Sequence, residues 1–354
     1  MPDPQTGVPL APLTTLRLGG PAQTLVTAST PDELTDIVRD ADRRREPLLL
    51  LAGGSNVVIA DDGFAGTVVL IRTRGLRRRR VGERALVTAQ AGEDWDAFVA
   101  ATVDDGLAGL ECLAGIPGSV GGTPIQNVGA YGQEVASTIV SVRVLDRKTH
   151  TVADLSPEQC GFGYRTSVFK HASRYVVLAV TFVLADSAAG GPVRYPELAR
   201  ALDAEVGENA PAAAIREAVL GLRRAKGMVL DAGDHDTWSA GSFFTNPVLD
   251  ASAFEQLLRR AAAVLEPGCV PPAFTEGDGR TKTSAAWLIE QAGFEKGHGR
   301  GAARLSTKHV LAITNRGTAT AREVLALADE LTTGVRDRFG IELTPEPVFV
   351  GIGC

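Results

Sequence analysis

Two glycine-rich segments in the first half of the chain contain the residue types that bind phosphate groups. The first is Gly53-Gly54-Ser55-Asn56, which directly follows the apolar run Leu48–Leu51. The second runs from Gly115 to Gly122 and reads GIPGSVGG. Successive glycines leave backbone N–H groups unshielded and permit positive φ, which creates concave anion sites. Tight turns alone explain either segment equally well, but two such segments in one domain favour a phosphate-bearing cofactor.

The usual nucleotide-binding motifs are absent from the sequence. Neither the GxGxxG pattern of Rossmann dinucleotide sites nor the GxxxxGK[ST] pattern of P-loop NTPases occurs. A cofactor would therefore be held by another type of glycine loop. Short hydrogen-bonding side chains accompany the glycines at Ser55, Asn56, Ser119 and Asn127.

Three further segments carry single residues that are suited to acid–base chemistry. Arg165 stands between aromatic residues in GFGYRTSVFK, where a guanidinium can polarise a carboxylate or a carbonyl. Ser242 lies between a glycine and two phenylalanines in SAGSFFTNP, a setting that suits a positioned hydroxyl. Glu346 stands between prolines in LTPEPVFV, where loss of solvent would raise its pKa. As bare patterns, all three are also compatible with ordinary surface residues.

Other classes of chemistry receive little support. The nucleophile elbow GxSxG is not matched, so the Ser242 hydroxyl is expected to donate a proton rather than attack. The four cysteines lie far apart without a CxxC pair, and the five histidines show no HExxH or HxxxH spacing. We therefore expect free thiols and no metal site.

Composition and charge exclude further functions. The 36 basic residues against 42 acidic ones give a net charge of −6, which argues against a nucleic-acid binder. The run Arg77–Arg80 is interpreted as a solvated face. The N-terminus lacks the pattern of a signal peptide, and no stretch offers the roughly 20 apolar residues of a membrane span. These features predict a cytoplasmic protein without a membrane partner, which we expect to be a monomer.

Strand and helix patterns alternate in the first half of the chain. Thr30-Pro31-Asp32-Glu33 begins a helix, since a capping hydroxyl precedes proline and two acids. A second helix is predicted after Glu93, and Gly109–Gly132 shows no helical period. Strands are predicted at Leu48–Leu51, Val57–Ile59, Thr67–Ile71, Thr138–Leu145 and Tyr175–Leu184.

The second half is predicted to be more helical. Ala185–Pro192 is small and glycine-rich, which is typical of a linker. Ile341–Val350 resembles a strand, but its two prolines predict an edge or irregular one. The fold class is therefore α+β in at least two domains. The remaining predicted elements are helices at Pro211–Ala225, Ala251–Leu265, Ser284–Gln291 and Ala321–Phe339 and a strand at Val310–Thr314.

Taken together and in order, the motifs resemble those of the MurB family of flavoenzymes from bacterial peptidoglycan precursor synthesis. The resemblance covers about Leu13 to Gly351. It depends on an ordered set of strings: LRLGGPA, LLAGGSNVVIADDGFAGTVV, GLECLAGIPGSVGGTPIQNVGAYGQE, FGYRTSVFK, AGSFFTNPV, AAWLIEQAGFEKG and ELTPEPVFVG.

The resemblance implies an FAD-binding domain of the vanillyl-alcohol-oxidase (PCMH) type, followed by a smaller α+β substrate-binding domain. The first would span 12–186, with subdomains at about 12–71 and 72–186. A linker with a tyrosine loop would occupy 187–208, and the substrate domain 209–354, its last strand returning to the active site. FAD would be bound non-covalently by Gly53, Gly54, Ser55, Asn56, Gly115, Ile116, Pro117, Gly118, Ser119, Gly121, Gly122, Gln126, Asn127, Gly129, Ala130 and Tyr131.

The same resemblance implies reduction of UDP-N-acetylglucosamine enolpyruvate with NADPH as co-substrate. Ser242 would protonate C2 of the enolpyruvyl group, and Arg165 and Glu346 would stabilise the enol-like intermediate. Tyr195 would close over the substrate diphosphate, as in the family's first subtype. Further contacts with substrate or nicotinamide nucleotide are implied for Tyr164, Lys226, Asn246 and Gln291.

The chain departs from the family pattern at two positions. Thr245 stands where the first subtype often has lysine, and Gly53 stands where many relatives have an acid. Two other functions were considered. Another FAD-dependent oxidoreductase of the same fold would explain the glycine loops, but not the joint presence of Arg165, Ser242 and Glu346. An inactive sugar-nucleotide-binding protein predicts the loss of one of those three residues, and none is missing.

Overall fold

The computed structural model describes residues 3–352, which form two compact units. Unit 1 comprises residues up to Pro9 together with Pro21–Gly54 and Gly63–Val229. Unit 2 comprises Leu10–Gly20, Ser55–Asp62 and the chain from Leu230 onward. No helix in the described part of the chain is long and apolar enough to span a membrane. Each unit has its own hydrophobic core.

A four-stranded sheet opens unit 1. Its strand order is β1-β2-β5-β3, in which β1 is antiparallel to β2 while β5 runs parallel to both β2 and β3. The helix α1, predicted from its start signal, is confirmed with a complete capping box at Thr30 and Glu33. It packs against β2 and β5 through Leu34 and Val38, which are fully buried. The elements are β1 (Gln5–Pro9), β2 (Pro21–Ala28), α1 (Pro31–Arg44), β3 (Leu48–Leu51) and β5 (Phe64–Ile71).

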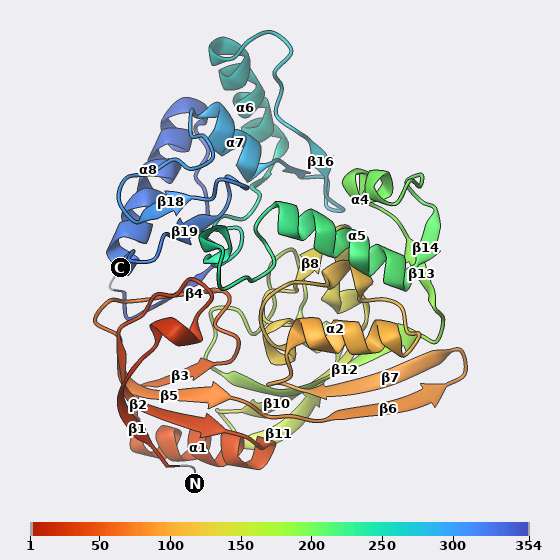
Figure 1. Cartoon of the computed structure of the whole chain (residues 1–354), viewed down its shortest axis with the longest axis vertical. Coiled ribbons are helices and arrows are strands. Elements are labelled where there is room, and N and C mark those ends of the chain that lie inside the picture. The colour runs from red at the N-terminus through yellow and green to blue at the C-terminus, as the bar shows by residue number, and fades with distance from the viewer. Residues whose placement is uncertain (1–2, 353–354) are drawn as a thin grey trace. The chain divides into compact units, whose positions relative to one another are not determined.

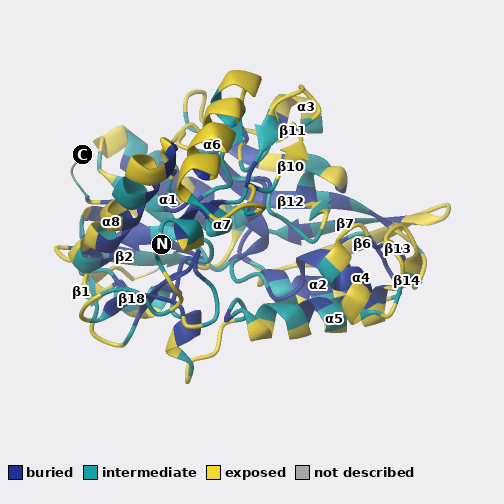
Figure 2. Cartoon of the chain, turned by 90° about the horizontal axis from the view of Figure 1, so that it is seen from above, coloured by how far each residue is buried: buried dark blue, intermediate teal, exposed yellow. Residues whose placement is uncertain are grey.

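A five-stranded antiparallel sheet forms the second part of unit 1 (Figure 1). Its strand order is β11-β10-β12-β7-β6, and Trp95 and Phe98 of α2 contact Phe182 of β12 through their rings. Figure 2 shows the strands β12 and β10 as largely buried and the β6–β7 hairpin as exposed at its tip. The elements are β6 (Leu76–Val81), β7 (Arg84–Gln90), α2 (Trp95–Asp104), β10 (Ile139–Asp146), β11 (Thr151–Leu155), α3 (Pro157–Cys160) and β12 (Tyr175–Ala185).

The expected linker is the main difference between prediction and structure. The segment Ala185–Pro192 contains the end of β12 and a further strand, β13 (Ala189–Pro192), which pairs with β14 (Asn209–Pro211). The following helix α4 (Pro196–Ala201) buries Leu198 in the core of unit 1. Unit 1 therefore continues through α5 (Ala212–Ala225) to Val229, not to the expected boundary at 186, because strand pairing and the core residues of α4 and α5 hold this part of the chain to the unit.

Unit 2 is built from three helices and several short strands. Its long helix α8 is held by a capping box at Thr320 and ends at Gly340, as the sequence pattern predicts. Ser284 caps α7 by accepting a hydrogen bond from the Trp287 amide. The elements are β4 (Val57–Ile59), β15 (Val248–Leu249), α6 (Ala251–Val264), β16 (Phe274–Thr275), β17 (Thr281–Lys282), α7 (Ala285–Gln291), β18 (Ala303–Leu305), β19 (Ile313–Asn315), α8 (Ala321–Phe339) and β20 (Val348–Val350).

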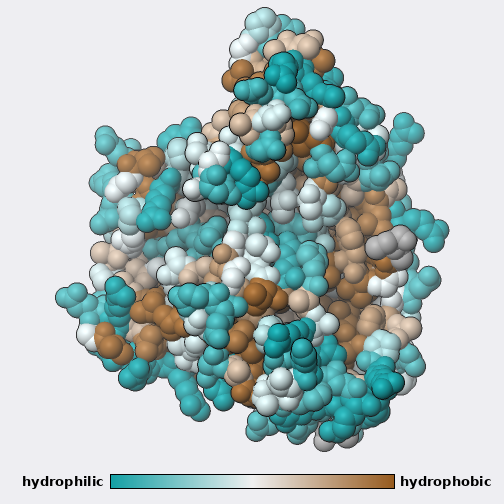
Figure 3. Space-filling view, turned by 180° about the vertical axis from the view of Figure 1, so that it is seen from behind, coloured by the Kyte–Doolittle hydropathy of each residue, from teal (hydrophilic) through white to brown (hydrophobic). Residues whose placement is uncertain are grey.

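Two predicted strands of unit 2 are altered in the structure. The predicted strand at Val310–Thr314 is shifted to β19, and only the last three residues of the predicted strand Ile341–Val350 become β20. β20 pairs with β4 in parallel, which joins the end of the chain to a segment almost 300 residues earlier, since Val348 is opposite Val57. The two prolines explain the short strand, because proline cannot donate a ladder hydrogen bond. On the face shown in Figure 3, hydrophobic residues form separate patches among hydrophilic ones.

Candidate functional site

Gly53 of the first predicted glycine loop meets Gly118 of the second within unit 1. A Cβ atom added to Gly53 would lie 2.5 Å from the Cα of Gly118, a distance that no real side chain tolerates. Gly118 itself has a φ of +136°, which disfavours any residue with a side chain. The glycines at these positions are therefore required so that the backbones can approach closely. Gly53 and Gly118 are thus close enough to contribute to one site.

Hydrogen-bond donors without partners line this junction. The Ser119 hydroxyl is buried and bonds to no residue in the described part of the chain. Within the same described range, no hydrogen bond uses the backbone amides of Gly54, Gly118 or Ser119. Buried donors are normally satisfied, so an orphan hydroxyl in a native site calls for an explanation. Unshielded amides beside a buried hydroxyl fit a phosphate group.

Side chains from α2 and the loop itself hold the second glycine segment in place. Asp96 accepts a hydrogen bond of 2.6 Å from the Gly115 amide, and the Trp95 indole donates to the Leu113 carbonyl at 2.9 Å. Buried Glu111 accepts from the Gly109 amide at 2.6 Å. These contacts fix the loop before any ligand binds, which lowers the entropic cost of binding.

Three predicted site residues of unit 1 adopt a left-handed backbone conformation. The φ angles are +46° for Asn127, +49° for Tyr131 and +52° for Arg165. Such angles are uncommon outside glycine and collect at functional sites. The Asn127 amide holds the loop by donating to Glu134 and to the carbonyl of Gly163. We therefore interpret Asn127 as a support for the loop, although the sequence suggested a direct cofactor contact.

Arg165 is directed at the loop that is expected to line the cofactor. Its Nη2 donates to the Gly129 carbonyl at 2.8 Å, and its guanidinium lies 5.8 Å from the ring centroid of Tyr164. Lys170 donates to the Arg165 carbonyl at 2.9 Å and so fixes the turn. The structure thus brings Arg165, Tyr164 and Gly129 together.

A second group of predicted residues gathers around Tyr131. The ring of Tyr195 meets it edge-on at 5.5 Å between centroids, and the Lys226 ammonium lies 5.9 Å from its ring centroid. Lys226 also forms an ion pair with Glu197 at 2.6 Å. Burial, more than the neighbouring charges, raises the pKa of Tyr131 to about 12, so its phenol stays protonated near neutral pH.

Arg223 is a residue of this group that the sequence did not single out. It lies on α5 and donates to the Met228 carbonyl at 2.8 Å, while its buried Nε has no partner within the described residues. Burial lowers its pKa to about 10, so it remains charged at neutral pH. The only available signal was its position three residues before Lys226.

In unit 2 the structure joins the segments that carry Ser242 and Glu346. The Glu346 amide donates to the carbonyl of Phe243 at 2.9 Å. The segments that carry Ser242 and Glu346 therefore lie side by side. The Thr245 amide also donates to Thr344 at 3.0 Å. Glu346 is 9% exposed, and no other described residue bonds to the half-buried Ser242 hydroxyl. The geometry leaves this hydroxyl available to a ligand.

The other predicted residues of unit 2 are already engaged. The Asn246 side chain accepts from the amide of Ala285, which is the first residue of α7. Gln291 accepts from the Cys269 thiol at 3.4 Å. The Asn56 side chain donates to the carbonyl of Glu346 at 3.3 Å, so Ser55 and Asn56 group with unit 2 and not with Gly53. These contacts orient the side chains without occupying all their hydrogen-bonding groups.

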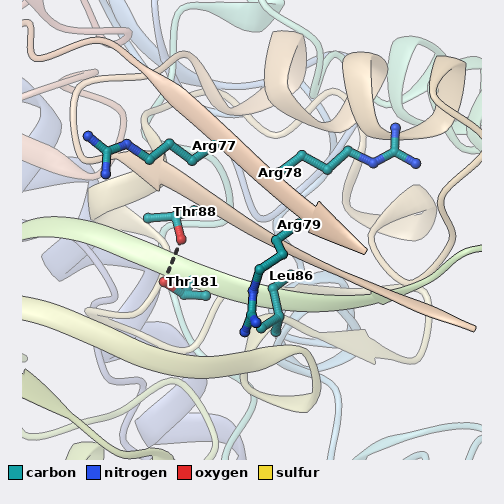
Figure 4. Close-up of a pocket in the computed structure, with 6 residues that line it drawn as sticks. All are labelled: Arg77, Arg78, Arg79, Leu86, Thr88 and Thr181. Atoms are coloured by element: carbon teal, nitrogen blue, oxygen red, sulfur yellow. Dashed lines mark hydrogen bonds between the residues drawn. The ribbon is translucent and has the colours of Figure 1, made fainter. Parts of the chain in front are cut away.

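A surface hollow of about 550 Å³ lies away from the predicted residues, on β6, β7 and β12 (Figure 4). Arg77, Arg78 and Arg79 line it together with Thr88 and Thr181, whose hydroxyls lie 2.9 Å apart. Two arginines of the run pair with acids, Arg78 with Asp105 and Arg80 with Asp186. The arginine run is thus an exposed strand, which agrees with its interpretation as a solvated face.

Within the described residues, no group of three or more histidine, cysteine, aspartate or glutamate side chains could hold a metal ion. Cys112 and Cys160 are free and buried, as expected, and Cys269 is free and half-buried. Cys354 lies outside the described residues.

Comparisons with known proteins find two domain models in the chain. Residues 22–155 match the model of an FAD binding domain, and residues 233–350 match the model of the C-terminal domain of UDP-N-acetylenolpyruvoylglucosamine reductase. The reductase of Thermobifida fusca is 55% identical over 98% of this chain and 97% of its own length. The reductase of Streptomyces avermitilis is 58% identical over 97% of this chain and 94% of its own length.

A solved structure extends the likeness to the fold. The crystal structure of UDP-N-acetylenolpyruvylglucosamine reductase (MurB) from Thermus caldophilus covers 98% of this chain and 98% of its own, with 26% identity and a TM-score of 0.62. The glycine junction, the Arg165 turn and the joined Ser242 and Glu346 segments are all present in the chain. On this similarity, the chain belongs to the UDP-N-acetylenolpyruvoylglucosamine reductase (MurB) family.

Proposed function

We propose that the chain is an NADPH-dependent flavoenzyme that reduces UDP-N-acetylglucosamine enolpyruvate to UDP-N-acetylmuramate in peptidoglycan precursor synthesis. The observation that carries the proposal is the junction of Gly53 with Gly118 beside the orphan Ser119 hydroxyl. It is a phosphate-binding cradle in a chain that is 55% identical to a named reductase over nearly its whole length. Both proposed substrates are cytoplasmic nucleotides, so we expect the enzyme there.

The residues present fit FAD. The amides of Gly54, Gly118 and Ser119 and the Ser119 hydroxyl would hold its pyrophosphate, since donors without partners suit a doubly charged group. The loop from Gln126 to Tyr131 would line the flavin ring. When bound, FAD would supply the hydride-transfer chemistry that links NADPH to C3 of the enolpyruvyl group. The protein's task is then to manage the charge and the proton that this transfer requires.

Three side chains would perform that task. Arg165 would stabilise the negative charge that develops on the substrate carboxylate, because a guanidinium binds carboxylates in a bidentate manner. Glu346, which is 9% exposed, would donate a hydrogen bond in its neutral form to the enol-like intermediate. The Ser242 hydroxyl, which bonds to no other described residue, would protonate C2.

The remaining predicted residues would position the nucleotide. Lys226 and Tyr195 carry the charge and the ring suited to a diphosphate, with Tyr195 at the start of α4 as in the family's first subtype. Tyr164, Asn246 and Gln291 would complete the contacts. Thr245 supplies no positive charge at a position where the family's first subtype often has lysine. Lys226 would therefore supply more of the positive charge that binds the diphosphate.

A two-step colour experiment tests the function. The purified protein should be yellow, and NADPH should bleach it in the absence of oxygen. Addition of UDP-N-acetylglucosamine enolpyruvate should then restore the colour and yield UDP-N-acetylmuramate. A protein that is bleached by NADPH but stays colourless with this substrate would be another flavin oxidoreductase of the same fold, and the substrate assignment would be rejected.

A further inference from the structure

The ion pair between Glu197 and Lys226 has no role in the chemistry proposed above. Its nitrogen and oxygen lie 2.6 Å apart, and the side chains are 33% and 34% exposed, respectively. Lys226 is the C-terminal cap of α5, where the helix dipole favours a cation. Glu197 lies in the first turn of α4, two residues after Tyr195. The pair therefore links the tyrosine-bearing turn to the end of α5.

The surroundings of the pair are rich in positive charge. Arg223 lies one helical turn before Lys226, and its electrostatic interactions include Tyr131 and Arg165. Glu197 in turn interacts with Tyr131, whose ring faces both Tyr195 and the Lys226 ammonium. The Glu197 carboxylate is thus paired with Lys226 within a cluster of cations and aromatic rings. Such a cluster is suited to bind an anionic ligand.

We propose that Glu197 is a displaceable counter-ion that holds Lys226 until the diphosphate of the substrate takes its place. This inference rests on the proposed function, because it assumes that Lys226 meets the diphosphate. A partly exposed lysine–glutamate pair is weak, and a diphosphate offers Lys226 more charge and more acceptor oxygens than one carboxylate. Release of Glu197 would also free the turn that carries Tyr195, so ligand entry and movement of that turn would be coupled.

The fold does not require the pair. Pro196 occupies the first position of α4, and Leu198 and Ala199 of the same helix are buried in the core of unit 1. These contacts anchor α4 independently of Glu197. A substitution of Glu197 should therefore change ligand affinity more than stability, and this separates a counter-ion from a merely structural ion pair.

The test uses the oxidised holoenzyme and isothermal titration calorimetry with two probes, UDP-N-acetylglucosamine enolpyruvate and inorganic pyrophosphate. We expect Glu197→Gln to bind both probes about three- to tenfold more tightly, because an anion that competes for Lys226 is removed. KM for the enolpyruvyl substrate should fall by a similar factor, while Glu197→Asp should restore wild-type affinity. In a Lys226→Gln background the gain should disappear, since the two residues act as a pair.

Glu217→Gln is the matched control. It removes a carboxylate of α5 that is 67% exposed and pairs with Arg216, and it should leave both affinities unchanged. If the wild-type protein binds the enolpyruvyl substrate and Glu197→Gln binds it equally well or more weakly, the counter-ion role is overturned. The proposed function would then remain intact. Tighter pyrophosphate binding without any binding of the enolpyruvyl substrate would support the counter-ion and reject the proposed function.

Discussion

The glycine junction of unit 1 and the Ser242–Glu346 segments of unit 2 are built on opposite principles. At the junction the backbone performs the function, and a Cβ at Gly53 would collide with Gly118. In unit 2 the backbone only holds two segments together, through the Glu346 amide and the Phe243 carbonyl, while the side chains remain available for chemistry. The first region is sensitive to any added atom, and the second to the loss of particular atoms.

This difference separates binding from chemistry in the proposed enzyme. A change in the junction should reduce the affinity for FAD and leave the intrinsic reactivity of any bound flavin almost unchanged. A change at Ser242 should leave flavin content untouched and impair only the half-reaction that needs a proton.

The largest effect is expected for Ser242→Ala. Loss of a general acid typically costs roughly 100- to 10,000-fold in rate, so reoxidation of the reduced flavin by substrate should slow by a factor in this range. Bleaching by NADPH should continue at the wild-type rate. Ser239→Ala, three residues earlier, serves as a control for general disturbance of the segment. Rapid reoxidation in Ser242→Ala would remove this residue from the mechanism.

Gly53→Ala tests the other region. Because the new methyl group would lie 2.5 Å from the Gly118 Cα, the two loops must separate, and we expect FAD affinity to fall by about 100-fold or more. Equilibrium dialysis of flavin against the apo-protein measures the change. Gly221→Ala on α5 is the control, since the added Cβ would have no neighbouring atom within 4 Å. Unchanged flavin affinity in Gly53→Ala would show that close backbone contact is not required.

A moderate effect is expected where side chains anchor the Ser242 segment. Buried Asp236 accepts hydrogen bonds from Thr307 and, at 2.7 Å, from Arg316. Although burial alone would raise the pKa of Asp236, these hydrogen bonds and the arginine hold it below its usual value. Asp236→Asn should therefore lower the free energy of unfolding at pH 7 by about 2 kcal/mol.

The sign of the pH dependence follows from the lowered pKa. The charged Asp236 stabilises the fold above the unfolded-state pKa of about 3.9, and this contribution is lost as pH falls through the lower folded-state value. The difference between wild type and Asp236→Asn should thus shrink below about pH 4. Denaturant titrations at several pH values measure it, with exposed Asp62→Asn as the control. A difference that is independent of pH would contradict a charge-based role.

The smallest effect is expected for Ser119→Ala. One hydrogen bond to the cofactor phosphate is lost while the amides remain, so FAD affinity should fall by roughly tenfold. The apo-protein should be as stable as wild type or slightly more so, because the orphan hydroxyl is removed. Ser137→Ala, whose hydroxyl bonds to the Glu134 carbonyl, is the control. An apo-protein that is clearly destabilised would mean that the Ser119 hydroxyl has a structural partner.

Much of the fold could be predicted because local signals agree with packing. Thr30 and Thr320 begin helices with complete capping boxes, and both helices are confirmed. The Arg77–Arg80 run was not recognised as a strand, because charge patterns describe solvent exposure and not backbone pairing with β7. Gly190 and Gly191 were interpreted as linker residues, although Gly190 is buried against Ile215. Composition alone does not distinguish flexible glycines from closely packed ones.

The candidate site was predictable to a different extent in each unit. The glycine loops and the positions of Ser242 and Glu346 follow from ordered motifs, whereas the contact between Gly53 and Gly118 depends on segments 65 residues apart. Arg223 and Glu197 were missed because each gains its significance from neighbours in space. Asn127 was assigned to the cofactor, yet its hydrogen bonds go to the protein.

Anaerobic stopped-flow measurement of both half-reactions tests the separation of binding from chemistry most directly. Wild type, Ser242→Ala and Gly53→Ala reconstituted with excess FAD are each mixed with NADPH and then with UDP-N-acetylglucosamine enolpyruvate. The account predicts that Ser242→Ala retains wild-type flavin reduction and loses only reoxidation, whereas Gly53→Ala has wild-type rates per bound flavin but binds much less of it. Equal slowing of both half-reactions in Ser242→Ala would contradict the central claim.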